Sequence, residues 1–308
     1  MTDLLVIANG RFQRGWTGRS WDRIVVRLRE MFGNGVEITF TASKGDATQF
    51  ARQALVDGVG WLAAAGGDGT IHEVVNGYFD KERNIQPKSP LSFLPCGSGN
   101  DWVRTLGIPR DLSKAVEALT QASARLVDVG HVRFRGLQGK VEERIFLNVA
   151  EAGVGGRMAA GKGSGGWLPQ GRLRYRLASL ATALNHRPQR LQLIIDGKTG
   201  LATGPVLSLI VAGGRYFGGG MHCAPMARPD DGLLEAITLG DFGWAEILYK
   251  SGRFFSGNYL DEPKVTHHSV RLLEVSSGEE VYLELDGELA GTLPATFTVL
   301  HHSLRLRC

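Results

Sequence analysis

The chain has 308 residues, of which 43% are hydrophobic and 21% charged, with a formal net charge of +4. This composition excludes an intrinsically disordered chain, and the length favours two domains over one. The mild positive charge allows attraction to anionic nucleotides or anionic lipid surfaces but gives no reason to expect nucleic acid as a partner. Cys96, Cys223 and Cys308 are too few and too far apart for a disulfide framework or a zinc site.

The first part of the chain is predicted to alternate buried strands with helices. Strands are expected at residues 4–8, 36–41, 59–65 and 92–94, and helices at residues 21–31, 46–55, 71–78, 101–107 and 112–119. This order with short connections predicts a parallel sheet covered by helices. Ligands of such sheets bind beyond the carboxyl ends of the strands. Asn9, Thr41 and the turns at residues 66–69 and 97–101 lie at such ends.

The glycine-rich turn at residues 66–69 surrounds Asp68 between a predicted strand and a predicted helix. Glycine lets the backbone approach a ligand closely, and a helix start offers unpaired N–H groups, so the turn is interpreted as a phosphate cradle. A carboxylate there would repel phosphates unless a cation lay between them, which favours a magnesium-linked Asp68. A tight turn in which Asp68 only caps the helix remains equally open. Thr70 and Glu73 predict a capping box for this helix.

From residue 125 onward, apolar residues alternate in short segments, which predicts an antiparallel β-rich domain. Strands are expected at residues 127–132, 145–149, 191–195, 206–211, 234–239, 270–275, 281–285, 297–300 and 304–306. Two helices interrupt them, one near residues 244–255 and one that carries Leu173, Leu177, Leu180 and Leu184. We place the domain boundary at residue 127, which gives domains of 1–127 and 128–308. The glycine-rich basic segment 157–174 is expected to be a mobile loop.

Four stretches of the sequence occur together in a fixed order. They are Gly66-Gly-Asp-Gly-Thr70, Pro95-Cys-Gly-Ser-Gly-Asn-Asp101, Ala224-Pro-Met-Ala-Arg-Pro-Asp-Asp-Gly-Leu-Leu234 and Leu285-Asp-Gly-Glu288. In this order and spacing they resemble the diacylglycerol kinase catalytic-domain family, most closely its soluble bacterial lipid kinases. Sphingosine kinases and, more remotely, NAD kinases are related. The resemblance implies an α/β fold: a phosphofructokinase-like parallel α/β domain that binds nucleotide, then an antiparallel β-sandwich domain for lipid, with the active site in the cleft between them.

The resemblance also implies an ATP-dependent lipid kinase that uses Mg²⁺ and phosphorylates a hydroxyl of a neutral lipid such as diacylglycerol. Phosphoryl transfer needs positioned phosphates, a divalent cation and a base for the attacking hydroxyl. The family positions for nucleotide and phosphates are Asn9, Thr41, Gly66, Gly67, Asp68, Gly69, Thr70 and Ser98. The catalytic positions are Asp68, with Asp101 and Asp128 as magnesium partners, and Glu288 as the base. A structural magnesium is implied at Asp231, with the backbone carbonyls of Arg228 and Leu233.

Without the family, several of these positions have simpler interpretations. Asp101 is equally well explained as a helix N-cap, and residues 286–288 and 230–232 as tight turns. For the whole chain, two other functions stay open: NAD-kinase-like phosphorylation of a soluble nucleotide, and a nucleotide-binding regulator without turnover. The turn at residues 97–101 and the late Glu288 favour the lipid branch. A binder alone need not keep a base, which argues against the regulator.

Gly156 stands where sphingosine-type kinases carry an Asp that holds the amino-alcohol head, which argues against a sphingoid substrate. No leader peptide and no apolar run of membrane-spanning length is expected, so we predict a cytoplasmic protein that meets its lipid at a membrane surface. The segment 157–174, with Trp167 and Arg172, is the candidate for contact with anionic lipids. Peripheral association with the inner membrane face and a homodimer are left open.

Overall fold

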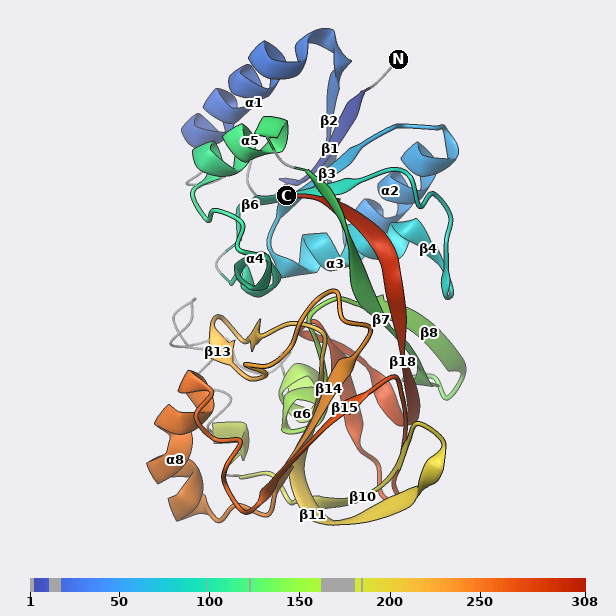
Figure 1. Ribbon diagram of the computed structural model, residues 1–308, viewed down its shortest axis with the longest axis vertical. Coiled ribbons are helices and arrows are strands. Elements are labelled where there is room, and N and C mark those ends of the chain that lie inside the picture. The colour runs from blue at the N-terminus through green and yellow to red at the C-terminus, as the bar shows by residue number, and fades with distance from the viewer. Residues whose placement is uncertain (1–2, 11–17, 98, 122, 162–180, 184) are drawn as a thin grey trace. The chain divides into compact units, whose positions relative to one another are not determined.

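The structure is a computed structural model that describes residues 3–10, 18–97, 99–121, 123–161, 181–183 and 185–308 (Figure 1). The chain forms two compact units. Unit 1 comprises Met1–Val127 and His302–Cys308, and unit 2 comprises Asp128–His301. The end of the chain therefore packs into the same unit as its beginning. Among the described residues, no helix combines the length and apolar character needed to cross a bilayer.

Unit 1 contains a parallel sheet whose strands are short apolar runs. The strands are β1 (Leu4–Asn9), β2 (Val36–Thr41), β3 (Leu62–Gly66) and β6 (Leu91–Pro95), in the order β2-β1-β3-β6. All five residues of β3 and all five of β6 are buried, as expected for strands covered on both faces. The end of β18 (Glu288–Arg307) adds a further parallel strand, since Leu306 pairs with Leu91. The sequence did not predict this addition.

Helices cover this sheet. They are α1 (Gly18–Phe32), α2 (Asp46–Val56), α3 (Asp68–Tyr78), α4 (Asp101–Leu106) and α5 (Leu112–Gln121), with the 3-10 turn η2 (Gly33–Gly35) and the small hairpin of β4 (Phe79–Asp80) and β5 (Arg83–Asn84). Alternate residues of a strand point to opposite faces. Leu4 and Val6 of β1 pack in one core with residues of α1 and α5. In Figure 1 these two helices lie together, and α2 and α3 lie together elsewhere on the sheet.

The predicted capping box of Thr70 and Glu73 is wrong. Helix α3 begins at Asp68, three residues earlier than the box requires, with Gly67 as an N-cap that has no side-chain cap bond. Thr70 therefore lies inside the helix. The Glu73 carboxylate instead accepts hydrogen bonds from the backbone N–H groups of Gly45 (3.0 Å) and Ala47 (3.3 Å). Glu73 thus stabilises the start of α2 rather than the start of its own helix.

Unit 2 is rich in antiparallel strands. The strands are β7 (Ala124–Gly136), β8 (Val141–Phe146), β9 (Val149–Gly153), β10 (Gln189–Ile195), β11 (Lys198–Ala212), β12 (Tyr216–Phe217), β13 (Met221–His222), β14 (Leu234–Gly240), β15 (Val265–Val270), β16 (Leu272–Ser276) and β17 (Tyr282–Leu285). One sheet has the order β15-β14-β11-β10-β16-β18, and β9 pairs with both β11 and β17. Of the helices in this unit, those whose bounds lie within the described residues are α6 (Val154–Gly161) and α8 (Trp244–Ser256).

Three strand predictions for the second half of the chain need correction. The expected strand at residues 145–149 is not one strand, because β8 ends at Phe146 and β9 begins at Val149. The expected strands at residues 297–300 and 304–306 are one strand, β18, because its exposed positions tolerate the polar residues between them. The expected strand at residues 270–275 is divided into β15 and β16 at Arg271. There the Asp196 carboxylate accepts hydrogen bonds from the N–H groups of Arg271 and Leu272, each at 2.9 Å. Alternation of apolar residues alone does not reveal such a break.

The segment 157–174 was expected to be a loop, and its first part is helical. Residues 157–161 form the second half of α6, because Val154, Met158 and Ala159 are buried on one side of that helix. The rest of the segment, including Trp167 and Arg172, lies outside the described residues. So do Leu173, Leu177, Leu180 and Leu184 of the predicted helix.

Candidate active site

Two glycine turns meet at the carboxyl ends of β3 and β6 in unit 1. Gly66 ends β3 and Gly67 caps α3, while Gly97 follows β6. A Cβ placed on Gly67 would lie only 3.2 Å from the Cα of Gly97, so the two backbones are in direct contact. The Cys96 N–H donates to the Gly66 carbonyl at 2.9 Å. Only residues without side chains allow turns to approach this closely, which explains the glycines of both sequence motifs.

Asp68 joins these turns at the start of α3. Its Oδ2 accepts the backbone N–H of Asn100 and its Oδ1 accepts that of Asp101, both at 2.9 Å. A Cβ on Gly99 would lie 2.6 Å from Asp68 Oδ2, so the carboxylate fits against bare backbone. Asp68 is therefore not merely a cap of its own helix: it fixes the start of α4 beside the start of α3.

The carboxyl groups of Asp68 and Asp101 are close enough to affect each other's charge. Burial, and then the negative charge of Asp101, raise the pKa of Asp68 to about 6, although backbone N–H donors act in the opposite direction. Asp101 is itself only 3% exposed. Two neighbouring carboxylates at a glycine turn provide the hard oxygen donors that Mg²⁺ prefers, and a divalent cation would offset their repulsion. The residues present therefore fit the magnesium ion that the sequence predicted.

Polar side chains from neighbouring strand ends reach the same turn. The Asn9 amide at the end of β1 donates to the Thr70 hydroxyl of α3 at 3.2 Å. The Gly10 N–H donates to the Thr41 hydroxyl at the end of β2, at 3.4 Å. The structure thus brings Asn9 and Thr70 together and places Thr41 next to the end of β1. The predicted residue Ser98 lies outside the described part of the chain.

Asp128 lies in unit 2 and forms hydrogen bonds with residues of that unit. Its Oδ2 accepts the N–H of Gly232 at 2.6 Å, and its Oδ1 lies 2.9 Å from Nδ1 of His301. Its own N–H donates to the Pro229 carbonyl at 2.7 Å. The structure therefore places Asp128 beside the turn of Asp231, where the sequence predicted the structural magnesium. The sequence had assigned Asp128 to the magnesium network of Asp68.

The turn from Arg228 to Leu233 gathers acidic groups. The Asp231 carboxylate accepts the N–H of Leu233 at 3.1 Å. Burial, followed by the charges of Glu235, Asp128 and Asp230, raises the pKa of Asp231. This concentration of carboxylate oxygens fits a magnesium ion chemically.

Glu288 begins β18 directly after a tight hairpin turn. Asp286 (φ 47°) and Gly287 (φ 88°) both have positive φ, as a two-residue hairpin loop requires. The Asp286 carboxylate accepts the N–H groups of Leu147, Asn148 and Val149 at 2.9, 2.9 and 3.0 Å. Asp286 thus anchors the turn that presents Glu288, a positioning role that sequence reasoning missed.

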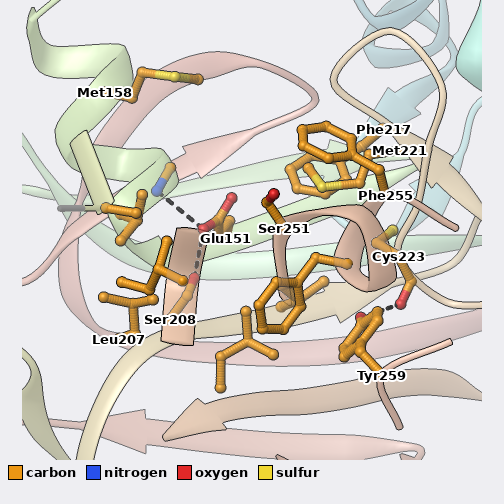
Figure 2. A pocket seen from close by; sticks show the side chains of 17 residues that line it. Glu151, Met158, Leu207, Ser208, Phe217, Met221, Cys223, Ser251, Phe255 and Tyr259 are labelled. Atoms are coloured by element: carbon orange, nitrogen blue, oxygen red, sulfur yellow. Dashed lines mark hydrogen bonds between the residues drawn. The ribbon is translucent and has the colours of Figure 1, made fainter. Parts of the chain in front are cut away.

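An apolar pocket in unit 2 was also missed (Figure 2). It is a cavity of about 110 Å³ between α6, β11 and α8, and its walls include Met158, Leu207, Phe217 and Phe255. Glu151 of β9 is the one acidic residue on these walls among the described residues. Its Oε1 accepts the Gly155 N–H at 2.9 Å and the Ser208 hydroxyl. Burial raises the pKa of Glu151. A charged residue inside the apolar run 149–154 was the available sequence signal.

Two family models match the chain. The diacylglycerol kinase catalytic domain matches residues 3–132, and the YegS C-terminal NAD kinase beta sandwich-like domain matches residues 148–308. A diacylglycerol kinase of Bacillus subtilis (strain 168) is 29% identical over 283 residues, which cover 92% of this chain and 88% of the relative. A probable lipid kinase YegS-like of Chromohalobacter salexigens is 30% identical over 275 residues, covering 86% of this chain and 80% of the relative.

Solved structures with this fold are also found. A putative diacylglycerol kinase from Bacillus anthracis str. Sterne superposes with a TM-score of 0.78 at 22% identity, covering 99% of this chain and 97% of that chain. Yeast NADH kinase complexed with NADH superposes with a TM-score of 0.52 at 11% identity, covering 96% of this chain and 79% of that one. At these identities the likeness concerns the fold alone. It confirms the expected order of an α/β domain followed by a β-rich domain.

Proposed function

Because the chain belongs to the diacylglycerol kinase catalytic-domain family and is a lipid kinase, we propose that it transfers the γ-phosphoryl group of ATP to a hydroxyl of a neutral lipid such as diacylglycerol. The observation that carries the proposal is the pairing of Asp68 with the start of α4 between two glycine turns. Phosphoryl transfer depends mainly on positioning and on electrostatic stabilisation, and this region supplies both.

In the proposed site, the backbone of Gly66, Gly67 and Gly69 and the side chains of Asn9, Thr41, Thr70 and Ser98 bind nucleotide and phosphates. Backbone N–H groups at a helix start suit phosphate oxygens, and α3 begins inside this turn. Asp68 and Asp101 would hold Mg²⁺. When bound, the ion neutralises charge that develops on the transferred phosphoryl group. The hydrogen bonds from Asn100 and Asp101 keep the Asp68 carboxylate in one orientation.

Glu288 is the proposed base, which accepts the proton of the lipid hydroxyl as it attacks. The anchored turn at Asp286 supports this role, because a base must be held in one position. For the structural magnesium we propose Asp231 with the carbonyls of Arg228 and Leu233. Asp128 would orient this turn through its hydrogen bond from Gly232.

The apolar pocket supports a lipid acceptor over a soluble nucleotide. NAD-kinase-like activity would need polar groups for sugar and phosphates, whereas the pocket of unit 2 is lined almost wholly by apolar atoms. Such walls suit an acyl chain, which gains free energy by leaving water. The likeness to NADH kinase does not weigh against this choice, since it concerns the fold alone.

The test is an assay of phosphate transfer from radiolabelled ATP in the presence of magnesium. Parallel reactions contain dioctanoylglycerol, sphingosine, NAD or no acceptor. We expect label in dioctanoylglycerol and none in the others, and we expect a chelator to abolish transfer. Label in NAD but in no lipid would overturn the proposal, and so would ATP binding without transfer to any acceptor.

We also propose that the lipid is met at a membrane surface, and helix α8 supports this. Trp244, Leu248 and Tyr249 are 69, 44 and 88% exposed on this helix. Ile247 and Phe254 of the same helix line the apolar pocket. Trp and Tyr favour the headgroup level of a bilayer. One helix therefore combines a wall of the pocket with side chains suited to the membrane interface.

Sedimentation with phosphatidylglycerol vesicles tests this contact. Replacing Trp244 and Tyr249 together by Ser should reduce the bound fraction several-fold, because both aromatic rings leave the interface. Val56→Ser is the matched control, since Val56 is 71% exposed on a helix of unit 1 and should not affect sedimentation. Equal binding by the double variant and the wild type would refute a role for α8.

A further inference from the structure

A few polar side chains lie among the apolar walls of the pocket of unit 2, and their hydroxyl hydrogens are already donated within the protein. The Ser251 hydroxyl donates to the Leu248 carbonyl at 2.9 Å. The Tyr259 hydroxyl donates to the carbonyl of Cys223, and the Ser208 hydroxyl donates to Glu151 (Figure 2). Among the described residues that line the pocket, the hydroxyl donors are therefore occupied. Among the described residues of the pocket walls, the Glu151 carboxyl group is the one left that can donate a hydrogen bond to a ligand.

The two oxygens of Glu151 differ in their surroundings. Oε1 accepts both hydrogen bonds, one from Gly155 and one from Ser208. Oε2 lies against Gly155, where a Cβ would overlap with it, and it receives no hydrogen bond from the described residues. Burial raises the pKa of Glu151, which favours the protonated acid. Because Oε1 already serves as the acceptor, the proton belongs on Oε2, which makes Oε2 a hydrogen-bond donor.

We propose that Glu151 is a specificity-determining residue: its carboxyl group donates a hydrogen bond to an ester carbonyl of a diacylglycerol-type lipid whose acyl chain fills the pocket. The inference rests on the proposed function, since it concerns recognition of the acceptor lipid. The apolar walls bind hydrocarbon of any origin and cannot distinguish one chain from another. A single donor among them distinguishes a chain that carries a carbonyl from one that does not.

An amine ligand fits this pocket less well than a carbonyl. Among the described wall residues there is no cationic side chain, so a charged Glu151 would have only the hydrogen bonds from Gly155 and Ser208 to offset its burial. An ammonium group would have to lose its hydration to form an ion pair inside apolar walls, which costs more than a neutral hydrogen bond. An ester carbonyl needs only one donor and carries its hydrocarbon chain with it. The surroundings of Glu151 therefore match an ester lipid.

The experiment compares two lipids that differ only in the carbonyl. Dioctanoylglycerol has two ester groups, and dioctylglycerol has ether oxygens, which are weaker acceptors, in the same places. Each lipid displaces a fluorescent diacylglycerol from the full-length protein in mixed micelles without ATP, and the ratio of the two dissociation constants is measured. The variants are Glu151→Leu, which removes the donor, and Glu151→Gln, whose amide keeps one. Ser251→Ala is the control, because its hydroxyl is committed to Leu248.

We expect the wild type to prefer the ester lipid roughly tenfold, the Leu variant to bind both equally, and the Gln variant to keep most of the preference. Ser251→Ala should change both affinities together and leave their ratio unaltered. Thermal unfolding of each variant identifies any that fails to fold, and the near-isosteric Gln variant keeps the test decisive. A preserved ratio in Glu151→Leu would overturn the inference, and so would a lost ratio in a folded Glu151→Gln.

Two further outcomes separate this inference from the proposed function. If the wild type prefers the ester lipid through Glu151 but phosphorylates no lipid, the kinase proposal fails and the binding role stands. If it phosphorylates dioctanoylglycerol and the ratio does not depend on Glu151, only the inference fails. Tighter displacement by sphingosine than by either glycerolipid, lost in Glu151→Gln, would mean that a charged Glu151 binds an amine.

Discussion

Asp68 in unit 1 and Glu151 in unit 2 are both acids whose pKa is raised by burial, yet their neighbours differ. Asp68 accepts two backbone N–H groups, from Asn100 and Asp101, and lies beside a second carboxyl group, that of Asp101. Glu151 accepts one N–H and one hydroxyl and otherwise faces apolar side chains. The first arrangement concentrates negative charge, and the second isolates one acid from other charges.

The same direction of shift therefore has two different consequences. Where two carboxylates lie together, a divalent cation offsets their negative charge, and the turn becomes a candidate metal and phosphate site. Where one acid lies among hydrocarbon, the neutral form is favoured, and the acid becomes a hydrogen-bond donor. A perturbed carboxyl group thus indicates a site, but its neighbours decide which chemistry that site can perform.

The largest expected effect is at Asp68. Asp68→Asn should lower kcat by on the order of a thousandfold, because the cation loses a charged ligand where charge develops in the transition state. Asp80→Asn is the matched control. It makes the same chemical change as Asp68→Asn, but at an exposed position on the hairpin of β4 and β5. Steady-state kinetics with dioctanoylglycerol measure both. A variant with nearly normal kcat would mean that the turn at Asp68 is only structural.

The next effect concerns Gly156 on α6, near the pocket of unit 2. A Cβ there would overlap the backbone carbonyl of Tyr282, so Gly156→Ala should lower the free energy of unfolding by about 3 kcal/mol. Gly161→Ala, at the end of the same helix, meets no atom of the described residues within 4 Å of its Cβ and should change this free energy little. Urea denaturation distinguishes the two. Equal stability of the two variants would contradict the close packing of α6 against β17.

Gly156 also shows what the sequence could and could not provide. The absence of the sphingosine-type Asp was visible in the sequence, but its physical reason was not. The structure supplies that reason, because no side chain fits between α6 and β17 at this position. The strands and helices of unit 1 were predictable, since apolar runs and glycine turns are local signals. The addition of β18 to this sheet joins Leu91 and Leu306, and no local pattern indicates such a pairing.

The turn at Asp68 and the pocket at Glu151 also differ in how well the sequence predicts them. Most of the turn at Asp68 comes from two short motifs, so their glycines and carboxylates could be recognised before the structure. The pocket at Glu151 is built from α6, β11 and α8, whose contributions are ordinary Met, Leu and Phe residues. In any sequence, such residues are typical of a buried hydrophobic core. Only the fold reveals that they leave a cavity with one acid on its wall.

A smaller effect is expected at Gly99, which approaches Asp68 from the second turn. A Cβ on Gly99 would lie 2.6 Å from Asp68 Oδ2, so Gly99→Ala should displace the carboxylate and lower kcat roughly tenfold. Gly60→Ala is the control, because apart from its chain neighbours no described residue places an atom within 4 Å of a Cβ at that position. If both alanine variants keep wild-type kcat, the orientation of the Asp68 carboxylate does not limit the reaction.

The smallest effect is a change of stability with pH at Glu151. Because the folded protein holds this proton more tightly than the unfolded chain, unfolding releases a proton once the pH exceeds the ordinary pKa of 4.5. The stability associated with Glu151 is therefore complete at low pH and is lost as the pH rises toward the folded pKa. Glu151→Gln does not titrate, so its stability should not include this loss.

Urea denaturation of both proteins between pH 5 and pH 8 measures the difference. We expect the wild type to lose roughly 1 to 3 kcal/mol relative to Glu151→Gln over this range, the cost of an uncompensated buried polar group. The shift at Asp68 is common to both proteins and cancels in the comparison. Near Glu151, burial raises the pKa of Tyr259, so that hydroxyl stays protonated throughout. Parallel pH profiles would show that Glu151 does not hold its proton, and the contrast with Asp68 would then disappear.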